Sequence, residues 1–375
     1  MLAALRYAGI PNWAVDVGPL LPAHTSDVAA ATETPPPGVP LVVHVNPPLL
    51  PVVLMRLPRS LVRGRTIIGY WAWELQSAPA DWHVGGRFVH EAWAPSQFSA
   101  SAIDWILPAR TRVVPHPVAV VPPAPSRLDR SAFGLPRDAV IVLVSFNLAS
   151  SFERKNPLAA IAAFRAAFGD RMDRILVLKI SHSEHFPDDF ARIVSVVAGA
   201  RNIRLQTQLL PAADLHALTR SCDIVLSLHR GEGFGLTMAE AMLLGKPVVA
   251  TGWSGNMTFM DADCAALVKY KLVRAEDPRQ VYVDGIWAEP DLESAAMELR
   301  RLAGCAAIRA ALGEAGCRVA SARLGIEPLL AAIGGRVATQ DPNSRRSELG
   351  NSDQSRYQLA ATNGHHDAGS AGTGS

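Results

Sequence analysis

The chain has 375 residues, enough for two domains of ordinary size, and 36 basic against 34 acidic residues leave a net charge of only +2. This balance argues against wholesale binding to nucleic acid. The four cysteines, Cys222, Cys264, Cys305 and Cys317, form no CxxC pair and have no histidine at metal-ligand spacing, so we expect reduced thiols and no metal site. No apolar run approaches the roughly 18 residues of a membrane span, and the start MLAALRYAGIPNW lacks the features of a signal peptide, which predicts a soluble, cytoplasmic protein.

Residues 1–121 are predicted to form a first Rossmann-like α/β domain. A short helix is expected at 2–9, followed by strands at 13–17, 41–45, 66–73, 88–94 and 111–114. Such a domain normally opens with a strand and a ligand-facing turn, whereas this chain opens with the helix. We therefore expect the first domain to lack its first strand.

Two segments of this half leave alternatives open. Residues 54–65 carry four arginines among leucines; a solvated helix face is favoured over a patch that touches anionic lipid at the inner membrane face. GYWAWEL ends the third of these strands with Trp71, Trp73 and Glu74 close together. Aromatic rings beside a carboxylate suit sugar recognition, and core packing of the two tryptophans is an equally good reading.

The proline-rich stretch within 122–135 predicts a linker, and residues 136–337 predict a second Rossmann-like domain. A buried strand is expected at 139–146, with Asn156 and Pro157 at the N-cap and first position of the helix that follows. Arg154 and Lys155 then sit between a strand's carboxyl end and a helix N-terminus. This placement favours a diphosphate clamp over a solvated charge pair.

The segment 223–256 predicts a strand, a glycine-rich loop, a helix and another strand. Thr237 and Glu240 have the spacing of a capping box at the start of the helix, which gives Glu240 a structural explanation. Glu232 has no such explanation. It stands directly before Gly233 in a loop that should face the ligand crevice at the carboxyl ends of the strands. The dinucleotide fingerprint GxGxxG, which an oxidoreductase on this sheet would carry, is absent.

From residue 338 onward there is no Val, Ile, Met, Phe or Trp, while Ser, Gly, Asn and Gln abound. Such a composition cannot bury a core. We expect residues 338–375 to form a disordered tail.

HRGEGFGLTMAEAMLLGKPVVAT resembles the donor-site signature of retaining glycosyltransferases of family 4, whose fold, called GT-B, has two Rossmann-like domains facing each other across a cleft. The similarity extends to SFERKNPLAAIAAFRAAF, GWSGNMTFM, WAEPD, GYWAWEL and HEAWAPSQF, and covers roughly residues 1 to 310. Within the family, the chain is similar to a bacterial subgroup that builds cell-surface polysaccharide.

The resemblance implies transfer of a sugar, with retention of configuration, from a nucleotide-diphosphate sugar to a glycan or a lipid-linked acceptor. It implies that Arg154 and Lys155 hold the diphosphate, and that Glu240 binds the ribose hydroxyls. It further implies that Glu232 holds the donor sugar, together with the loop and helix residues Gly233, Phe234, Gly235, Leu236 and Asn256. No metal or other cofactor is expected, because enzymes of this fold generally need none.

The sequence departs from the family at two places. Where many relatives have a Gly-Arg pair before the lysine, this chain has Phe146 and Asn147, so that the cationic clamp rests on Arg154 and Lys155. Relatives also begin with a strand and a glycine-containing loop that face the diphosphate, and this sequence starts after both. The alternative hypothesis is therefore a non-catalytic nucleotide-sugar-binding protein or an inactive truncated homologue.

Overall fold

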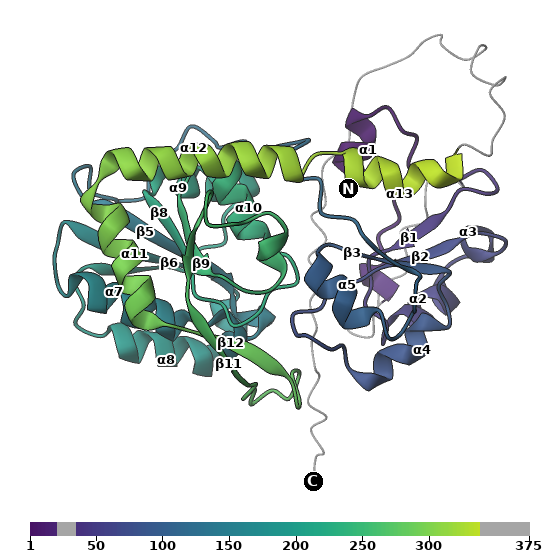
Figure 1. Cartoon of the computed structure of the whole chain (residues 1–375), viewed down its shortest axis with the longest axis horizontal. Helices are drawn as coiled ribbons and strands as arrows, with labels where there is room; N and C mark the ends of the chain where they lie inside the picture. The colour runs from purple at the N-terminus through teal and green to yellow at the C-terminus, as the bar shows by residue number, and fades with distance from the viewer. Residues whose placement is uncertain (21–34, 338–375) are drawn as a thin grey trace.

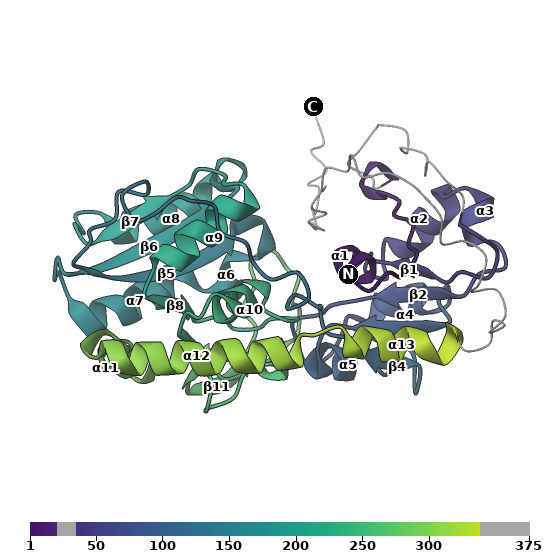
Figure 2. The same cartoon turned by 90° about the horizontal axis from the view of Figure 1, so that it is seen from above.

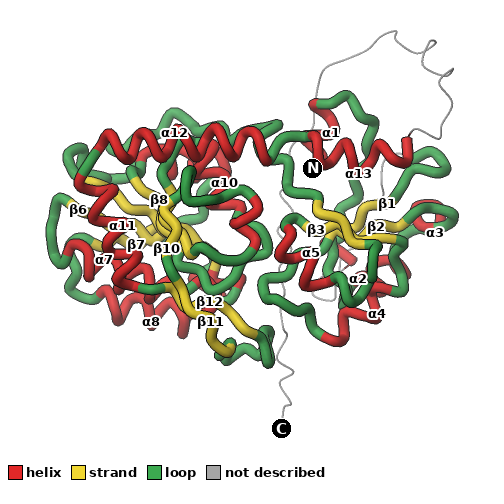
Figure 3. The backbone as a smooth tube through the Cα atoms, viewed as in Figure 1, coloured by secondary structure: helices red, strands yellow, loops and turns green. Residues whose placement is uncertain are grey.

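The structure is a computed structural model that describes residues 1–20 and 35–337 (Figure 1). Two parallel sheets lie side by side, one in each half of the chain, and Figure 3 shows them as two separate groups of strands. In the described part of the chain the first sheet has the order β1-β2-β3-β4 and the second β10-β9-β8-β5-β6-β7. The mixed α/β class and the two parallel sheets that the sequence predicts are confirmed.

The bounds of the strands are β1 Leu41–Val43, β2 Ile67–Tyr70, β3 Glu91–Ala94, β4 Thr111–Val113, β5 Val140–Asn147, β6 Arg174–Ser181, β7 Ile203–Gln206, β8 Ile224–Ser227, β9 Val248–Thr251, β10 Ala266–Val268, β11 Tyr270–Arg274 and β12 Ile286–Pro290. The bounds of the helices are α1 Leu2–Tyr7, α2 Leu50–Arg56, α3 Arg59–Val62, α4 His83–Gly86, α5 Gln97–Ile103, α6 Phe152–Lys155, α7 Pro157–Phe168, α8 Pro187–Val197, α9 Ala212–Ser221, α10 Leu236–Leu243, α11 Leu292–Gly304, α12 Ala306–Arg323 and α13 Glu327–Val337.

The residues of β5 show why helices cover both faces of the second sheet. Its even-numbered residues Val142, Val144 and Phe146 belong to the core that α7, α8 and α11 cover, while Ile141 and Leu143 belong to the core under α9, α10 and α12. An apolar run buried on both faces is typical of a central parallel strand. Helices on both faces leave the carboxyl ends of the strands as the open edge, where ligands bind in such sheets.

The last described helix returns to the first half. Figure 2 shows α12 and α13 end to end along one side of the molecule, α12 beside the second sheet and α13 beside the first. Leu329 and Ala332 of α13 share a core with Ile68 and Trp93 of the first sheet. The sequence predicts that residues 136–337 form the second domain, whereas α13, at the end of this range, packs on the first sheet.

The tail predicted at 338–375 lies outside the described residues. The strand expected at 13–17 is wrong, since those residues form no strand. Val15 and Val17 pack against the first core, but the Gly18 N–H donates to Asp16 Oδ1 at 2.8 Å, and this local turn replaces a ladder partner.

The arginines of 54–65 do not form one patch. Arg65 is buried and donates to the carbonyl oxygens of Pro35, Pro36 and Val39, so it holds a loop in place. Arg56 donates to the carbonyl oxygen of Leu20. In the described residues, no helix is long and apolar enough to cross a bilayer.

Candidate active site

Two loops at the carboxyl edge of the second sheet come together because β5 and β8 are neighbours in it. β5 and β8 pair in parallel, with Val142 opposite Ile224, so both strands end at the same edge. The first loop turns into α6 at Ser151, whose φ is 71°, and out of it at Asn156, whose φ is 52°. These turns leave Arg154 and Lys155 facing the loop that follows β8.

Lys155 and Glu232 form an ion pair at this edge. Lys155 Nζ lies 2.5 Å from Glu232 Oε1, and Arg154 Nη1 lies 3.4 Å from the same oxygen. Burial on its own raises the pKa of Glu232, but the two cations outweigh it and hold that pKa at about 2. Burial lowers the pKa of Lys155, and Glu232 opposes this effect. The carboxylate is therefore ionised throughout the neutral range and has a cation on each side.

Arg154 braces the two loops. Its side chain is only 2% exposed and donates to Gly231 O at 2.7 Å and to the carbonyl and hydroxyl oxygens of Ser150 at 2.8 and 2.7 Å. A planar guanidinium with several donors suits such a role, which a lysine could not fill. Of the two cations that the sequence assigns to a clamp, Arg154 is thus largely committed to protein oxygens, whereas Lys155 keeps a fifth of its side chain exposed.

Helix α10 begins one residue before the predicted position. Gly235 is its N-cap, with a φ of 100°, and no side chain caps the helix. The predicted capping box of Thr237 and Glu240 is therefore wrong, because the left-handed turn at Gly235 places Thr237 inside the first turn. The first helical hydrogen bond runs from the Met238 N–H to Gly235 O, which leaves the N–H groups of Leu236 and Thr237 at the positive end of the helix.

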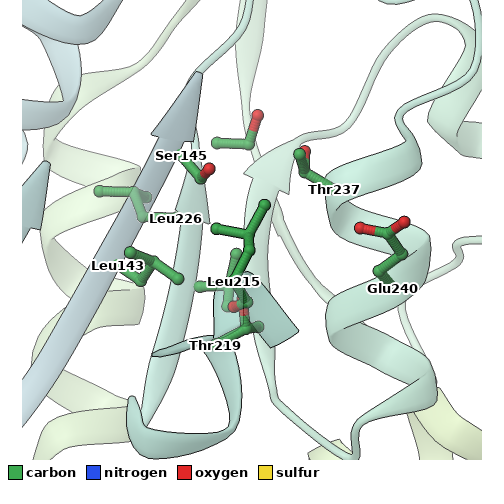
Figure 4. A pocket seen from close by; sticks show the side chains of 9 residues that line it. Leu143, Ser145, Leu215, Thr219, Leu226, Thr237 and Glu240 are labelled. Atoms are coloured by element: carbon green, nitrogen blue, oxygen red, sulfur yellow. The ribbon is translucent and has the colours of Figure 1, made fainter. Parts of the chain in front are cut away.

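Glu240 does not cap the helix, and its side chain lines a small pocket beside the sheet (Figure 4). Figure 4 shows Glu240 and Thr237 on α10 across the pocket from Ser145, near the end of β5. His216 Nε2 lies 3.9 Å from Glu240 Oε1, and this carboxylate is the main cause of the raised pKa of His216. Glu240 thus lines a pocket to which Glu232 does not contribute.

The remaining residues that the resemblance implies have structural contacts of their own. Gly233 O accepts from Ser96 Oγ at 2.6 Å and Ser99 Oγ at 3.2 Å, both from the first half. Phe234 is buried against the rings of His116 and Phe259. Their contribution to a ligand site would therefore come from the backbone around them.

Asn256 and Leu236 differ from each other in burial. Asn256 is fully buried and donates from Nδ2 to Thr251 O at 3.1 Å, while its Oδ1 lies 3.1 Å from His229 Nε2. Leu236, in contrast, is 45% exposed. The structure therefore places Asn256 as a support of the loop.

Three contacts of the site were not foreseen from the sequence. Ser254 Oγ accepts from the Glu232 N–H at 2.9 Å and fixes the backbone that carries this carboxylate. Glu74, from the first half, lies 3.7 Å from Arg154 Nη2, and Tyr282 OH donates to Glu74 Oε2 at 3.3 Å. The position of Glu74 beside two tryptophans in GYWAWEL had indicated that it could be functional, whereas no pattern around Tyr282 had indicated a role for that residue.

The tryptophans beside Glu74 are core residues. Trp71 is fully buried, Trp73 is 5% exposed, and both stack edge-on against Trp82. Of the two alternatives for this segment, core packing accounts for both rings. In residues 1–20 and 35–337, no group of three or more His, Cys, Asp or Glu side chains is placed to hold a metal ion.

Comparison with known proteins agrees with this geometry. The model of a family described as "Glycosyl transferases group 1" matches residues 148–282, which contain Arg154, Lys155, Glu232 and Glu240. The D-inositol 3-phosphate glycosyltransferase of a Nocardioides species is 29% identical over 185 residues, which are 46% of this chain and 39% of that protein. The chain thus spans about two fifths of the length of this relative.

Solved structures share the fold at low identity. HepE of Anabaena, in a complex with UDP and glucose, superimposes with a TM-score of 0.59 at 16% identity, covering 80% of this chain and 78% of HepE. WaaG, a glycosyltransferase involved in lipopolysaccharide biosynthesis, gives a TM-score of 0.52 at 15% identity over 79% and 85% of the two chains. The chain therefore has the GT-B fold of these glycosyltransferases, and residues 148–282 within it match the group 1 glycosyl transferases.

Proposed function

We propose that the chain is a glycosyltransferase that moves a sugar, with retention of anomeric configuration, from a nucleotide-diphosphate sugar to a glycan or a lipid-linked acceptor. The observation that carries the proposal is the meeting of Lys155 and Glu232 beside the N-terminus of α10, within the segment that matches the family. A cation, a carboxylate and free helix N–H groups are the groups that a sugar diphosphate requires.

Each group has a separate role in the proposed reaction. Breaking the bond between the anomeric carbon and the phosphate oxygen builds negative charge on the leaving phosphate, which Lys155 and the first N–H groups of α10 stabilise. Glu240 accepts from the ribose hydroxyls in the pocket beside Ser145. Glu232 accepts from hydroxyls of the donor sugar.

Retention follows most simply from attack on the same face. The acceptor oxygen forms its bond to the anomeric carbon as the phosphate leaves, and the departing phosphate oxygen takes the acceptor proton. No protein side chain acts as a general base in this proposal, and no metal or other cofactor takes part. Addition of EDTA should therefore leave turnover unchanged.

The acceptor and the cellular site also belong to the proposal. The role of WaaG in lipopolysaccharide biosynthesis supports a bacterial cell-surface polysaccharide as the product class. A cytoplasmic enzyme that contacts the inner face of the membrane would meet such acceptors.

The test is turnover of a panel of UDP-, GDP- and ADP-sugars, read as nucleotide release, with the anomeric configuration of the product determined by NMR. We expect Lys155→Ala and Glu232→Ala to abolish release. Lys271→Ala, at an exposed position of β11, is the matched control and should be fully active. Full activity in both site variants would sink these roles, and an inverted product would sink retention.

A nucleotide-sugar-binding protein without catalysis is the second candidate. It is favoured by the observation that both cations already pair with Glu232, so that a donor must displace an existing contact. Calorimetry that shows UDP binding in a chain without any turnover would support this candidate. Turnover by the chain as given would exclude it.

A further inference from the structure

A second cavity lies between the two halves, and Ser254, which contacts the backbone of Glu232, is one of its lining residues. Its volume is about 570 Å³, within the range of small-molecule sites, roughly 300–1,000 Å³. The first half contributes Gln76, Gln97 and Phe98, and the second contributes the exposed ring of Tyr270 and the largely buried Trp253. The cavity is thus formed by both halves together.

Aromatic rings and neutral polar groups line this cavity. The rings of Phe98 and Trp253 meet edge to face with centroids 4.8 Å apart. The ring centroids of Tyr270 and Trp253 lie 6.4 Å apart. Gln97 Nε2 donates to Ser101 Oγ at 3.2 Å, so amide and hydroxyl groups stand at the rim beside the rings. Ring faces cover C–H groups and amides exchange hydrogen bonds with hydroxyls, which is the pairing that a sugar ring needs.

Charge separates this cavity from the site with Lys155. None of the residues that line it is charged, so it offers nothing to a diphosphate, whose recognition depends on cations and helix N–H groups. The two sites nonetheless share one wall, because Ser254 lines the cavity and accepts from the Glu232 N–H at 2.9 Å. Ser254 thus connects the cavity to the backbone of the loop that carries Glu232.

We infer that this cavity binds a neutral saccharide unit of the acceptor. The inference rests on the proposed transfer, and it gives the acceptor a chemical class: an uncharged glycan whose sugar ring lies against Tyr270 and Trp253 and whose hydroxyls meet Gln76 and Gln97. Since both halves contribute walls, the saccharide also holds the halves together while the donor reacts.

The experiment measures saccharide binding apart from turnover. Saturation-transfer NMR with maltose, cellobiose and chitobiose, with and without UDP, reports binding directly. Tyr270→Ala and Gln97→Ala remove a ring and an amide from exposed positions, so neither should disturb folding. We expect each to weaken saccharide binding about tenfold and to leave UDP affinity unchanged. Trp105→Ala and Gln208→Ala, an exposed ring and an exposed amide outside the cavity, are the matched controls.

Turnover distinguishes the failure of this inference from the failure of the proposed function. In the two cavity variants, KM for the acceptor should rise about tenfold while donor hydrolysis without acceptor stays at the wild-type rate. A raised KM for the donor, unchanged saccharide binding in both variants, or no saccharide bound by the wild type would overturn the inference. A wild type that binds saccharide but releases no nucleotide would overturn the proposed transfer alone.

Discussion

Lys155 Nζ lies 2.5 Å from Glu232 Oε1, so the cation assigned to the diphosphate and the carboxylate assigned to the donor sugar are bonded to each other. A donor that enters this site has to exchange an existing ion pair for its own contacts. The anion competes with Glu232 for Lys155, and its sugar hydroxyls then compensate Glu232 for the lost cation. Because of this exchange, removal of the Glu232 charge should strengthen nucleotide binding, whereas mutation of a binding residue ordinarily weakens it.

Glu232→Gln should bind UDP several-fold more tightly than the wild type and yet lose turnover. The amide no longer competes for Lys155, and the freed ammonium is available to the diphosphate. Calorimetry with UDP and nucleotide release with the donor measure the two effects. Glu276→Gln, at an exposed position near β11, is the control and should change neither. Weaker UDP binding in Glu232→Gln would show that the carboxylate assists the diphosphate contact.

Acid should remove the stability that Glu232 contributes. Its pKa is about 2 in the folded chain against 4.5 for an unperturbed glutamate, so the contribution is fully present above about pH 4.5 and is lost as the pH falls towards 2. The difference in unfolding free energy between the wild type and Glu232→Gln should therefore shrink over this window. Urea unfolding at pH 7, 4 and 2.5 measures it; a difference that is independent of pH would contradict the ion pair.

Arg154→Lys should destabilise the fold by about 3 kcal/mol, because a lysine cannot serve Gly231, Ser150 and Glu232 at once and leaves buried acceptors without donors. Turnover should fall as well, since the loop with Glu232 loses its brace. Urea unfolding with Arg137→Lys, an exposed arginine, as the control decides the matter. A loss of activity at unchanged stability would instead assign Arg154 directly to the substrate.

Glu240→Gln should weaken UDP binding about tenfold and leave the affinity for inorganic pyrophosphate unchanged, because Glu240 lines the pocket beside Ser145, where we propose that the ribose binds, and Lys155 does not line it. The pKa of His216 should fall in the same variant, since the neighbouring Glu240 carboxylate is what raises it. Calorimetry and an NMR titration of His216 measure the two effects. An equal loss of affinity for both ligands would place Glu240 at the diphosphate.

Gly255→Ala should cost about 2 kcal/mol of stability and most of the activity. A Cβ there would fall on the carbonyl group of Gly233, and the loop with Glu232 would have to move. Gly304→Ala, where a Cβ meets no atom within 4 Å, is the matched control and should leave stability unchanged or slightly higher. Urea unfolding and nucleotide release measure both variants. Normal turnover in Gly255→Ala would show that the position of this loop does not matter.

Strong local signals in the sequence were sufficient for the central elements. β5 lies within one residue of its predicted bounds, α7 begins at Pro157 as predicted, and β8, α10 and β9 follow the order predicted for 223–256, because long apolar runs stand between Gly, Pro and Asn signals. The exposed hairpin of β11 and β12 was missed, since β11 is exposed at every residue and shows no apolar alternation. The strand at 13–17 was wrong for the converse reason: two partly buried valines, Val15 and Val17, gave alternation without a pairing partner.

The site needed information that one sequence does not contain. Lys155 and Glu232 meet because β5 lies next to β8 although two strands separate them along the chain, and local patterns do not determine strand order. The capping box was misassigned because a φ of 100° at Gly235 shifts the start of α10. Glu74 and Tyr282 approach Arg154 only through tertiary packing. What the sequence did indicate was which side chains lack a local explanation, and Glu232 was one of them.

Because α13 packs on the first sheet, the core of the first half cannot be completed until the end of the chain has been synthesised. Ile68, Tyr70 and Trp93 leave the ribosome more than 200 residues before Leu329, their partner in the same core. Until the rest of the chain follows, this face of the first sheet lacks the cover of α13 and has Ala4 of α1 packed on it, so that it remains prone to association with other chains. An isolated first half, expressed alone, should therefore aggregate, and co-expressed α12 and α13 should restore its solubility.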